Sequence, residues 1–325
     1  MSGLYDSFQR PINYLRISVT DRCNLRCIYC MPIEGIQSIP HNEILRYEEI
    51  YLVAQAAAKL GINKLRLTGG EPLIRSHLVT LVGMLAEIEG IDDVSLTTNG
   101  VLLKHYAFAL KQAGLDRVNI SIDSLQQRKF RRITRLGTVD DVLEGISAAH
   151  QAGLEPVKIN TVVLRGVNDD EIIDFAQKTI DEGWHVRFIE LIPIGQGQRR
   201  KWFMPLSEIR ARIEELGTLE PCPLSGNGPA KYFRLPDSRG TIGFISPVTE
   251  HICVRCNRLR LTADGKLRPC LLSDEEIDLR ELLRRGASSE QICHLIQEAV
   301  AAKPQGHQLA KGISSKKQAM AQIGG

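Results

Sequence analysis

Apolar positions in the first 193 residues alternate between short continuous runs and longer helical patterns. A short apolar run predicts a buried strand, and apolar residues three or four positions apart predict an amphipathic helix. The predicted strands cover residues 14–19, 64–68, 94–98, 117–123, 157–164 and 185–192. The predicted helices between them cover residues 47–60, 77–88, 102–113, 139–152 and 170–182.

Glycines mark the ends of three of these helices, because Gly61, Gly114 and Gly153 follow the last apolar position of each pattern. Strands that alternate with helices favour a parallel sheet with right-handed crossovers. Six such units predict an α/β fold, a partial (β/α)6 barrel of the TIM type. In such folds the chemistry gathers at the carboxyl ends of the strands.

The alternation stops near residue 193, and the remaining pattern predicts a C-terminal α+β extension. Its predicted helices cover 205–216, 279–285 and 289–301, and its predicted short antiparallel strands cover 232–235, 241–245, 258–262 and 266–268. Ala263-Asp264-Gly265 supplies a hairpin turn between the last two strands. We therefore expect a barrel domain over 1–193, a second region over 194–308 and a flexible tail over 309–325.

Three cysteines follow the first predicted strand directly. Cys23, Cys27 and Cys30 have the spacing C-x3-C-x2-C. Three thiolates can hold a 4Fe-4S cluster and leave its fourth iron open to an exchangeable ligand. The alternatives are a zinc knuckle or ordinary buried thiols, but zinc loops usually join a C-x2-C pair to a second pair. The odd count therefore favours an iron-sulfur cluster.

A second triplet, Cys253, Cys256 and Cys270, lies near the other end of the chain. Taken alone, this triplet fits a second cluster and a structural zinc site equally well. A zinc site would take its fourth ligand from Cys222, Cys293 or His251. Arg258 and Arg260 lie between these cysteines, and strand alternation directs both to one face, beside the metal that the triplet would hold.

Composition narrows the function classes. The chain has 325 residues, eight cysteines and a formal net charge of +3. Cysteines at metal-binding spacing, without an apolar signal segment, favour a reduced cytoplasmic setting over a secreted disulfide scaffold. No stretch is long enough to cross a membrane. The mild charge and few aromatic residues give no indication of nucleic-acid binding.

The motifs together resemble those of radical S-adenosylmethionine enzymes and, within them, the GTP 3′,8-cyclase family, also called molybdenum cofactor biosynthesis protein A. The similarity covers nearly the whole chain, in segments 15–32, 66–75, 96–100, 118–124, 187–190 and 253–260 and in the terminal Gly324-Gly325. The first triplet identifies only the superfamily. The second triplet, its two arginines and the diglycine end are what resemble the cyclases.

The resemblance implies two 4Fe-4S clusters and S-adenosylmethionine as cofactors. It implies cofactor-binding roles for Tyr29, Gly70, Glu71, Thr97, Ser121 and Lys158. Segment 68–72 would receive the methionine part, with Glu71 available to its ammonium group, whereas a plain Gly-Gly-Pro turn is the alternative for these residues. The chain departs from the family at Ile192, where a relative can have methionine, so a contact through that sulfur is in doubt.

Six cations are expected to bind the nucleotide, since a triphosphate needs several positive charges and the arginine fork suits phosphate oxygens. They are Arg16, Lys64, Arg66, Arg187, Arg258 and Arg260, of which Arg16, Arg258 and Arg260 are expected nearest the chemistry. Ordinary salt bridges to Glu71 or Glu190 are the alternative for the strand arginines. The chain has no GxxxxGK[ST] loop, so the nucleotide is not held as in an ATPase.

The implied reaction is lyase-type and needs an external electron donor. Reduced cluster and S-adenosylmethionine would generate a 5′-deoxyadenosyl radical, which removes hydrogen from C3′ of GTP. The C3′ radical then attacks C8, and the product is 3′,8-cyclo-7,8-dihydro-GTP, formed in the first step of molybdenum cofactor biosynthesis. The family also implies a homodimer, cyclic pyranopterin monophosphate synthase as the downstream enzyme, and a tail whose Gly324-Gly325 end enters the active site.

Two other function classes remain open from the sequence. A different radical enzyme with an auxiliary cluster, for example a peptide-modifying enzyme, would keep the first triplet but need no arginine-lined triphosphate site. A non-catalytic zinc-binding or nucleic-acid-binding protein would need four-ligand metal sites and a basic face.

Overall fold

The computed structural model describes residues 3–192, 201–224, 228–250 and 252–307. Its strands form one sheet in the order β12-β11-β10-β1-β2-β3-β4-β5-β6-β9-β8-β7. The six expected strands lie in its centre: β1 (Tyr14–Ser18), β2 (Lys64–Thr68), β3 (Asp93–Thr98), β4 (Arg117–Ser121), β5 (Lys158–Val163) and β6 (His185–Glu190). Each pairs in parallel with the next, which confirms the partial barrel.

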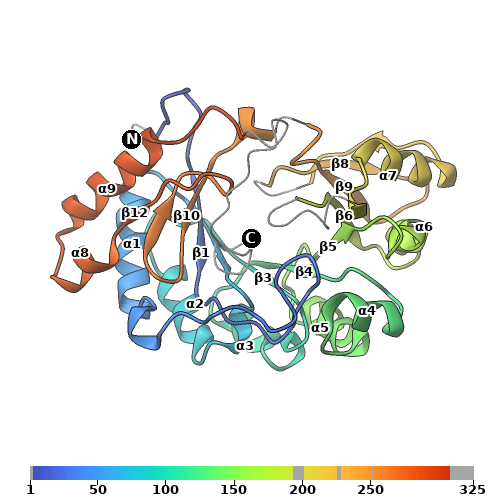
Figure 1. Ribbon diagram of the computed structural model, residues 1–325, viewed down its shortest axis with the longest axis horizontal. Helices are drawn as coiled ribbons and strands as arrows, with labels where there is room; N and C mark the ends of the chain where they lie inside the picture. Colours follow the sequence, from blue (N-terminus) through green and yellow to red (C-terminus); the bar gives the residue numbers. More distant parts are fainter. Residues whose placement is uncertain (1–2, 193–200, 225–227, 251, 308–325) are drawn as a thin grey trace.

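Helices cover the outer side of the curved sheet, and the strands face a central space (Figure 1). The five expected helices are α1 (Tyr47–Lys59), α2 (Leu78–Ala86), α3 (Ala107–Gln112), α5 (Val139–Gln151) and α6 (Ile172–Asp181). A sixth, α4 (Gln127–Thr134), was not expected. Short 3-10 turns occur at η1 (His41–Glu43), η2 (Pro72–Ile74), η3 (Leu103–His105), η4 (Asp169–Glu171), η6 (Glu214–Leu216) and η7 (Ile252–Arg255).

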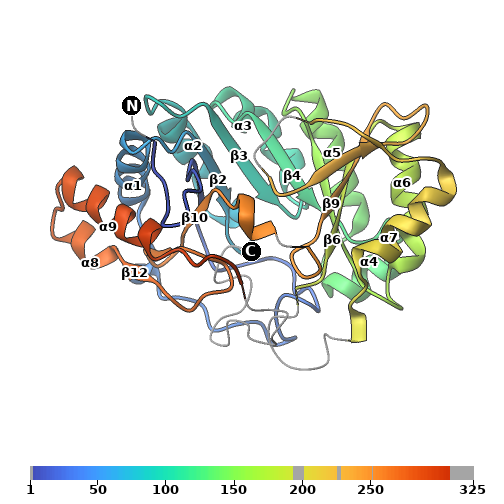
Figure 2. The ribbon, with the colours of Figure 1, turned by 90° about the horizontal axis from the view of Figure 1, so that it is seen from above.

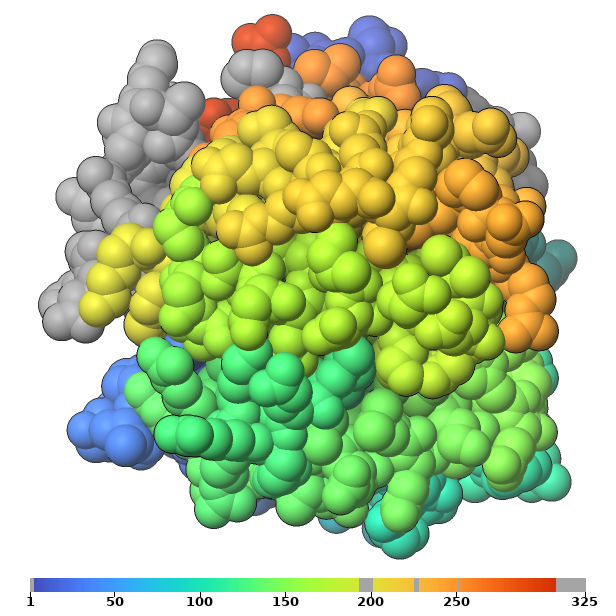
Figure 3. All heavy atoms as spheres, turned by 90° about the vertical axis from the view of Figure 1, so that its right-hand side faces the viewer, coloured from blue at the N-terminus to red at the C-terminus, as the bar shows by residue number. Residues whose placement is uncertain are grey.

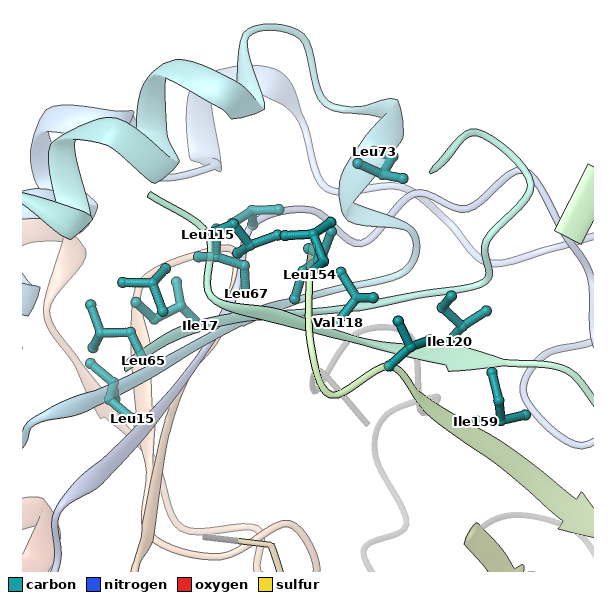
Figure 4. Close-up of a cluster of buried hydrophobic side chains, with 14 of the residues drawn as sticks. Leu15, Ile17, Leu65, Leu67, Leu73, Leu115, Val118, Ile120, Leu154 and Ile159 are labelled. Carbon is teal, nitrogen blue, oxygen red and sulfur yellow. The ribbon is translucent and has the colours of Figure 1, made fainter. Parts of the chain in front are cut away.

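The hydrophobic core lies between the sheet and these helices (Figure 4). Leu15 and Ile17 of β1 and Leu65 of β2 are fully buried there. Because side chains alternate along a strand, Arg16 and Arg66 belong to the opposite face, toward the barrel interior. The sequence pattern of β1 and β2 therefore builds a core on one side and a cationic surface on the other.

The extension joins both edges of the barrel. Its expected antiparallel pairs are present as β8 with β9 and β10 with β11, but β9 and β10 also pair in parallel with the barrel, which was not expected. β9 (Thr241–Ile245) pairs in parallel with β6, and β10 (Arg258–Leu261) pairs in parallel with β1. Antiparallel pairing begins beyond them, with β7 (Glu220–Pro221), β8 (Lys231–Arg234), β11 (Lys266–Arg268) and β12 (Ile277–Asp278). The open edges of a partial barrel present unpaired backbone groups, and β9 and β10 satisfy them.

The extension also carries α7 (Leu206–Ile213), α8 (Arg280–Arg284) and α9 (Ser289–Ala301). Seen from above, α8 and α9 lie beside α1, while α7 lies beside α6 (Figure 2). On the face that carries α6 and α7, the barrel segments in green and the extension segments in yellow pack directly against each other (Figure 3). Since the sheet continues past residue 193, the proposed domain boundary there stays a prediction.

Local turn chemistry explains the predicted ends. Gly61 and Gly114 have positive φ angles of 91° and 98°, which glycine adopts without strain. The predicted hairpin is confirmed, because Thr262 N donates to Lys266 O at 2.9 Å and Gly265 has a φ of 86°. Within the described residues, we find no helix with the length and apolarity needed to cross a membrane.

Candidate active site

Both cysteine triplets line one cavity of about 350 Å³ on the inner face of the sheet. The first triplet comes from the loop after β1, and the second comes from the segments that flank β10 and β11. β1 and β10 are neighbouring parallel strands, so residues from opposite ends of the chain meet in one site. The first triplet lies at the carboxyl end of β1, as predicted, whereas the second lies beside the amino end of β10, where Arg258 is the register partner of Tyr14.

The loop of the first triplet is fixed by backbone contacts. Leu25 N donates to Cys23 Sγ at 3.4 Å, and Asn99 Nδ2 lies 3.9 Å from the same sulfur. Burial raises the pKa of the Cys23 thiol to about 12 and that of Cys27 well above its ordinary value. These thiols will ionise only if a cationic group binds them, as metal ligation does.

The Gly69-Gly70 turn packs directly on this loop. A Cβ at Gly70 would lie 2.1 Å from Arg22 O, and one at Gly69 would lie 2.4 Å from Thr20 O. Gly70 N donates to Thr20 O at 2.8 Å. Both glycines also line the cavity. The absence of side chains thus lets two backbones approach each other, in addition to the ligand approach that the sequence predicts.

The second triplet lies in a more cationic setting. Leu272 N donates to Cys270 Sγ at 3.5 Å, like the contact at Cys23. Burial raises the pKa of Cys256, but the charges of Arg258 and Lys303 outweigh it and lower that pKa to about 6. Amide hydrogen bonds to sulfur and nearby charges are features that tune iron-sulfur clusters.

Two of the possible zinc ligands lie elsewhere. Cys293 donates to Ala56 O at 3.5 Å, Cys222 lies beside Pro223, and neither lines the cavity. His251 lies outside the described residues. All eight cysteines are free thiols.

The geometry of the thiols also bears on what could bind them. Thiolates around one zinc ion lie roughly 3.8 Å apart, given Zn–S bonds of about 2.3 Å. Among the described residues, no group of three Cys, His, Asp or Glu side chains is arranged to hold a single ion. Cysteines of a cluster bind different irons and stand farther apart than the ligands of one zinc ion.

Three arginines form a row across the inner face of the sheet. Arg260 of β10, Arg16 of β1 and Arg66 of β2 are successive register partners, and all three line the cavity. Arg66 Nε donates to Ser95 Oγ at 3.1 Å. Burial and the charge of Arg260 lower the pKa of Arg16. Burial and Arg258 lower the pKa of Arg260 to about 10. This crowding favours an anion with several charges.

Arg187 and Arg258 extend the same cationic lining. Burial lowers the pKa of Arg187, and its Nε has no hydrogen-bond partner in the described chain. Gly243 makes room for this side chain, because a Cβ there would lie 2.8 Å from Arg187 Cγ. Arg187 is therefore held in a narrow slot with donor capacity left for a ligand.

In the part of the chain that the structure describes, Glu71 and Glu190 take other partners than the strand arginines. Glu71 accepts from Leu73 N at 3.0 Å, Thr98 Oγ1 at 2.7 Å and Asn99 N at 2.7 Å. Glu190 accepts mainly from groups of segments 206 and 246–249. Burial raises the pKa of Glu71 to about 7. Glu71 is not among the residues that line the cavity, and its contact with an ammonium group stays a prediction.

Tyr29, Gly70, Thr97 and Ser121 line the cavity as predicted. Sequence reasoning missed Asp123, which also lines it. Tyr29 OH donates to Asp123 Oδ2 at 2.6 Å, and Val162 N donates to Asp123 Oδ1 at 2.8 Å. Burial raises the pKa of Asp123 to about 6. Its position at the end of β4, inside segment 118–124, was the signal that could have identified it.

Further residues of the lining are Asn160, Ile192, Lys303 and His307. Asn160 Oδ1 is buried without a hydrogen-bond partner among the described residues, which makes it a free acceptor. Ile192 presents an aliphatic side chain to the cavity. The terminal Gly324-Gly325 lies outside the described residues.

Lys64 and Lys158 are not part of the lining. Lys64 precedes Arg66 on the same face of β2. Lys158 is buried, with Nζ 5.5 Å from the ring centroid of Tyr232. Burial and the charge of Arg187 lower the pKa of Lys158 to about 7.

Comparison with known proteins gives two family matches. A radical SAM superfamily profile matches residues 17–179, and a Molybdenum Cofactor Synthesis C profile matches residues 184–309. A protein of Thermodesulfovibrio yellowstonii named GTP 3′,8-cyclase is 56% identical over 93% of this chain and 94% of its own length. A protein of the same name from Pelotomaculum thermopropionicum is 54% identical over 99% of this chain and 100% of its own.

Solved structures show the same fold at low identity. Streptococcus suis SuiB bound to precursor peptide SuiA has a TM-score of 0.61 at 13% identity, covering 97% of this chain and 77% of its own. The enzyme anSMEcpe with bound AdoMet has a TM-score of 0.60 at 15% identity, covering 87% of this chain and 77% of its own.

Proposed function

The chain belongs to the GTP 3′,8-cyclase family of the radical SAM superfamily, and from this premise we propose that it converts GTP to 3′,8-cyclo-7,8-dihydro-GTP in the first step of molybdenum cofactor biosynthesis. One observation carries the proposal. A single cavity is lined by two cysteine triplets and by a row of arginines. A radical enzyme with another substrate would have no evident use for this row.

The cysteines would hold two 4Fe-4S clusters, one on Cys23, Cys27 and Cys30 and one on Cys253, Cys256 and Cys270. When bound, the first cluster and S-adenosylmethionine supply one-electron chemistry that yields a carbon radical able to remove hydrogen from C3′ of GTP. The Gly69-Gly70 turn holds the first cysteine loop against the sheet. The protein thereby fixes the direction from which the radical meets the substrate.

S-adenosylmethionine would lie between the first triplet and the ends of β3 to β5. Tyr29, Gly70, Thr97 and Ser121 line this part of the cavity. Tyr29 and Asp123 hold each other in place through a 2.6 Å hydrogen bond. The free acceptor Asn160 Oδ1 lies on β5, where it is the register partner of Ser121. These groups would orient the nucleoside part of the cofactor.

GTP would lie with its triphosphate on Arg16, Arg66, Arg187, Arg258 and Arg260. Charge-assisted hydrogen bonds from arginine forks match phosphate oxygens in geometry and charge. Lys64 and Lys158 would add their positive charges to the electrostatic field of the cavity without lining it. The base would then point toward the second triplet, which adjoins Arg258 in the sequence.

The wider setting follows from the same family. We propose a small external electron donor for the first cluster, cyclic pyranopterin monophosphate synthase as the downstream enzyme, a homodimer, and a cytoplasmic location. The tail ending in Gly324-Gly325 would enter the cavity near the first cluster.

The test is an anaerobic assay of reconstituted, reduced protein with S-adenosylmethionine, with and without GTP. We expect 5′-deoxyadenosine together with a cyclised GTP product. Formation of 5′-deoxyadenosine while GTP stays unconverted would reject the cyclase and keep the superfamily. Absence of both products from protein that carries both clusters would reject the radical chemistry as well.

A further inference from the structure

Lys303 joins two parts of the second cysteine site. Its Nζ donates to Arg258 O at 2.8 Å and to Pro269 O at 2.6 Å. Arg258 follows Cys256 by two residues, and Pro269 precedes Cys270 directly. Lys303 is only 4% exposed, and it lines the cavity. The ammonium group of Lys303 therefore connects the start of β10, just after Cys256, with the residue that precedes Cys270.

The third sulfur is tied to the same segment by Arg10. Arg10 Nη1 donates to Cys253 O at 2.7 Å and to Gln305 O at 2.9 Å, and Nη2 donates to Pro304 O at 2.7 Å. Asp6 holds this guanidinium through a 2.5 Å ion pair. Hydrogen bonds donated by Lys303 and Arg10, both largely buried, thus connect residues 303–305 with the backbone at or near all three cysteines.

The charge of Lys303 also reaches the sulfurs. Its Nζ is bonded to carbonyl groups two residues after Cys256 and one residue before Cys270, so its charge lies close to both. Among the described residues, the hydrogen-bond partners of Lys303 Nζ are carbonyl oxygens and not carboxylates. Carbonyl groups satisfy its hydrogen bonds without cancelling its charge, so the positive charge remains available to the sulfurs.

We propose that Lys303 is a positioning residue for the second cluster, which holds the cysteine segments together and keeps a fixed positive charge beside their sulfurs. The inference rests on the proposed function only in taking the second triplet to bind a cluster. A nearby cation favours the form of a cluster that carries the extra electron, because net charge sets its potential. Partners outside the ligands themselves typically change metal affinity by about 10–100-fold.

The experiment separates the charge from the hydrogen bonds. Lys303→Met removes both, Lys303→Gln keeps a donor without the charge, and Lys303→Arg keeps the charge. Lys266→Met is the matched control, because Lys266 lies on β11 of the same region but pairs with Glu276 at 2.5 Å. Iron content and EPR-monitored redox titration are measured on reconstituted protein, and the first cluster is identified by its response to S-adenosylmethionine.

We expect the second cluster to be reduced at a more negative potential in the Gln and Met variants, and near the original potential in the Arg variant. Iron loss should be largest for Lys303→Met. The first cluster and Lys266→Met should be unchanged. An unchanged second potential in both neutral variants would overturn the proposal. Equal damage to both clusters would also overturn it, in favour of a general structural role. These readouts need no GTP turnover, so failure of the proposed cyclase activity would be seen separately, in the unaltered protein.

Discussion

Arg16 of β1 and Arg260 of β10 are register partners on neighbouring parallel strands, so two cations lie side by side on one face of the sheet. Like charges directly opposite each other on a sheet are destabilising. Burial lowers the pKa of both side chains, and a neighbouring positive charge lowers it further, that of Arg260 for Arg16 and that of Arg258 for Arg260. The pair is therefore organised for a ligand that brings negative charge. Four predictions about the site, and one expectation that rests on the sequence, can be tested.

Removing one arginine should weaken GTP binding without unfolding the protein. A hydrogen bond to a charged group contributes about 1.5–3 kcal/mol, so we expect Arg260→Ala to raise the dissociation constant of GTP by roughly 10–150-fold. Calorimetry on protein with both clusters measures this. Arg285→Ala, at an exposed position on the other side of the sheet, should leave the constant unchanged. Equal affinity of Arg260→Ala and the unaltered protein would remove the arginine row from the site.

Substitutions in the two cysteine triplets should affect different steps of the reaction. Cys27→Ala should abolish cleavage of S-adenosylmethionine, because the first cluster loses a ligand. Cys256→Ala should keep cleavage and lose conversion of GTP. Cys293→Ala, outside the cavity, should affect neither. The measurement is 5′-deoxyadenosine and nucleotide product from the same reaction, and cleavage that survives in Cys27→Ala would sink the assignment of the first cluster.

Gly70→Ala should damage the first site through backbone packing. Its Cβ would lie 2.1 Å from Arg22 O, so the cysteine loop must move away. We expect lower iron content and little cleavage of S-adenosylmethionine, with the EPR signal of the second cluster retained. Gly83→Ala is the matched control, because the nearest atom to that Cβ is 4.0 Å away and helix α2 should gain up to about 1 kcal/mol. Normal iron loading in Gly70→Ala would contradict the packing argument.

GTP binding should take up a proton through Lys158. Its pKa is lowered to about 7 in the ligand-free protein, so the amine is mostly neutral above that pH. A bound triphosphate raises this pKa, because it favours the charged form. Affinity should therefore fall as pH rises from 7.5 to 9, by up to about tenfold per unit. Lys158→Arg should flatten the curve, and calorimetry in buffers of different ionisation enthalpy counts the proton. A curve that stays equally steep in this variant would exclude Lys158 as the source.

The sequence-based expectation concerns the tail. Deleting Gly324-Gly325 should impair turnover and leave both clusters loaded. Replacing both residues by alanine keeps the length and tests whether the missing side chains matter. Turnover equal to that of the full chain would show an ordinary frayed end.

The local pattern of apolar residues was sufficient to predict the strands and helices of the barrel, but not how the strands at its two edges pair. The six strands and five helices follow from periodicity and from glycines at helix ends. Helix α4 was missed because its buried apolar positions are few, with Phe130 and Ile133 set among charged residues. The parallel placement of β9 and β10 depends on which strands remain unpaired in the folded barrel, and no local pattern contains that information.

The residues of the site likewise divide into those that the local sequence predicts and those that only the tertiary fold brings together. Cysteine spacing and strand alternation predicted the six thiols and the arginine row. Glu71 could not be placed, because its partners Thr98 and Asn99 come from another strand end. Lys303 carries no local signal at all, since its role depends on carbonyl groups of segments 258 and 269 that only the tertiary fold brings to it.

The pairing of β1 with β10 sets an order of events during synthesis. Asn13 and Asn257, at the start of these strands, are joined by a hydrogen bond across a separation of 244 residues. At ribosomal rates of about 5–20 residues per second, roughly 12–50 s pass between the emergence of the two. During that interval the β1 edge has no β10 to pair with, and the first cysteine loop is made before the second half of the cavity exists.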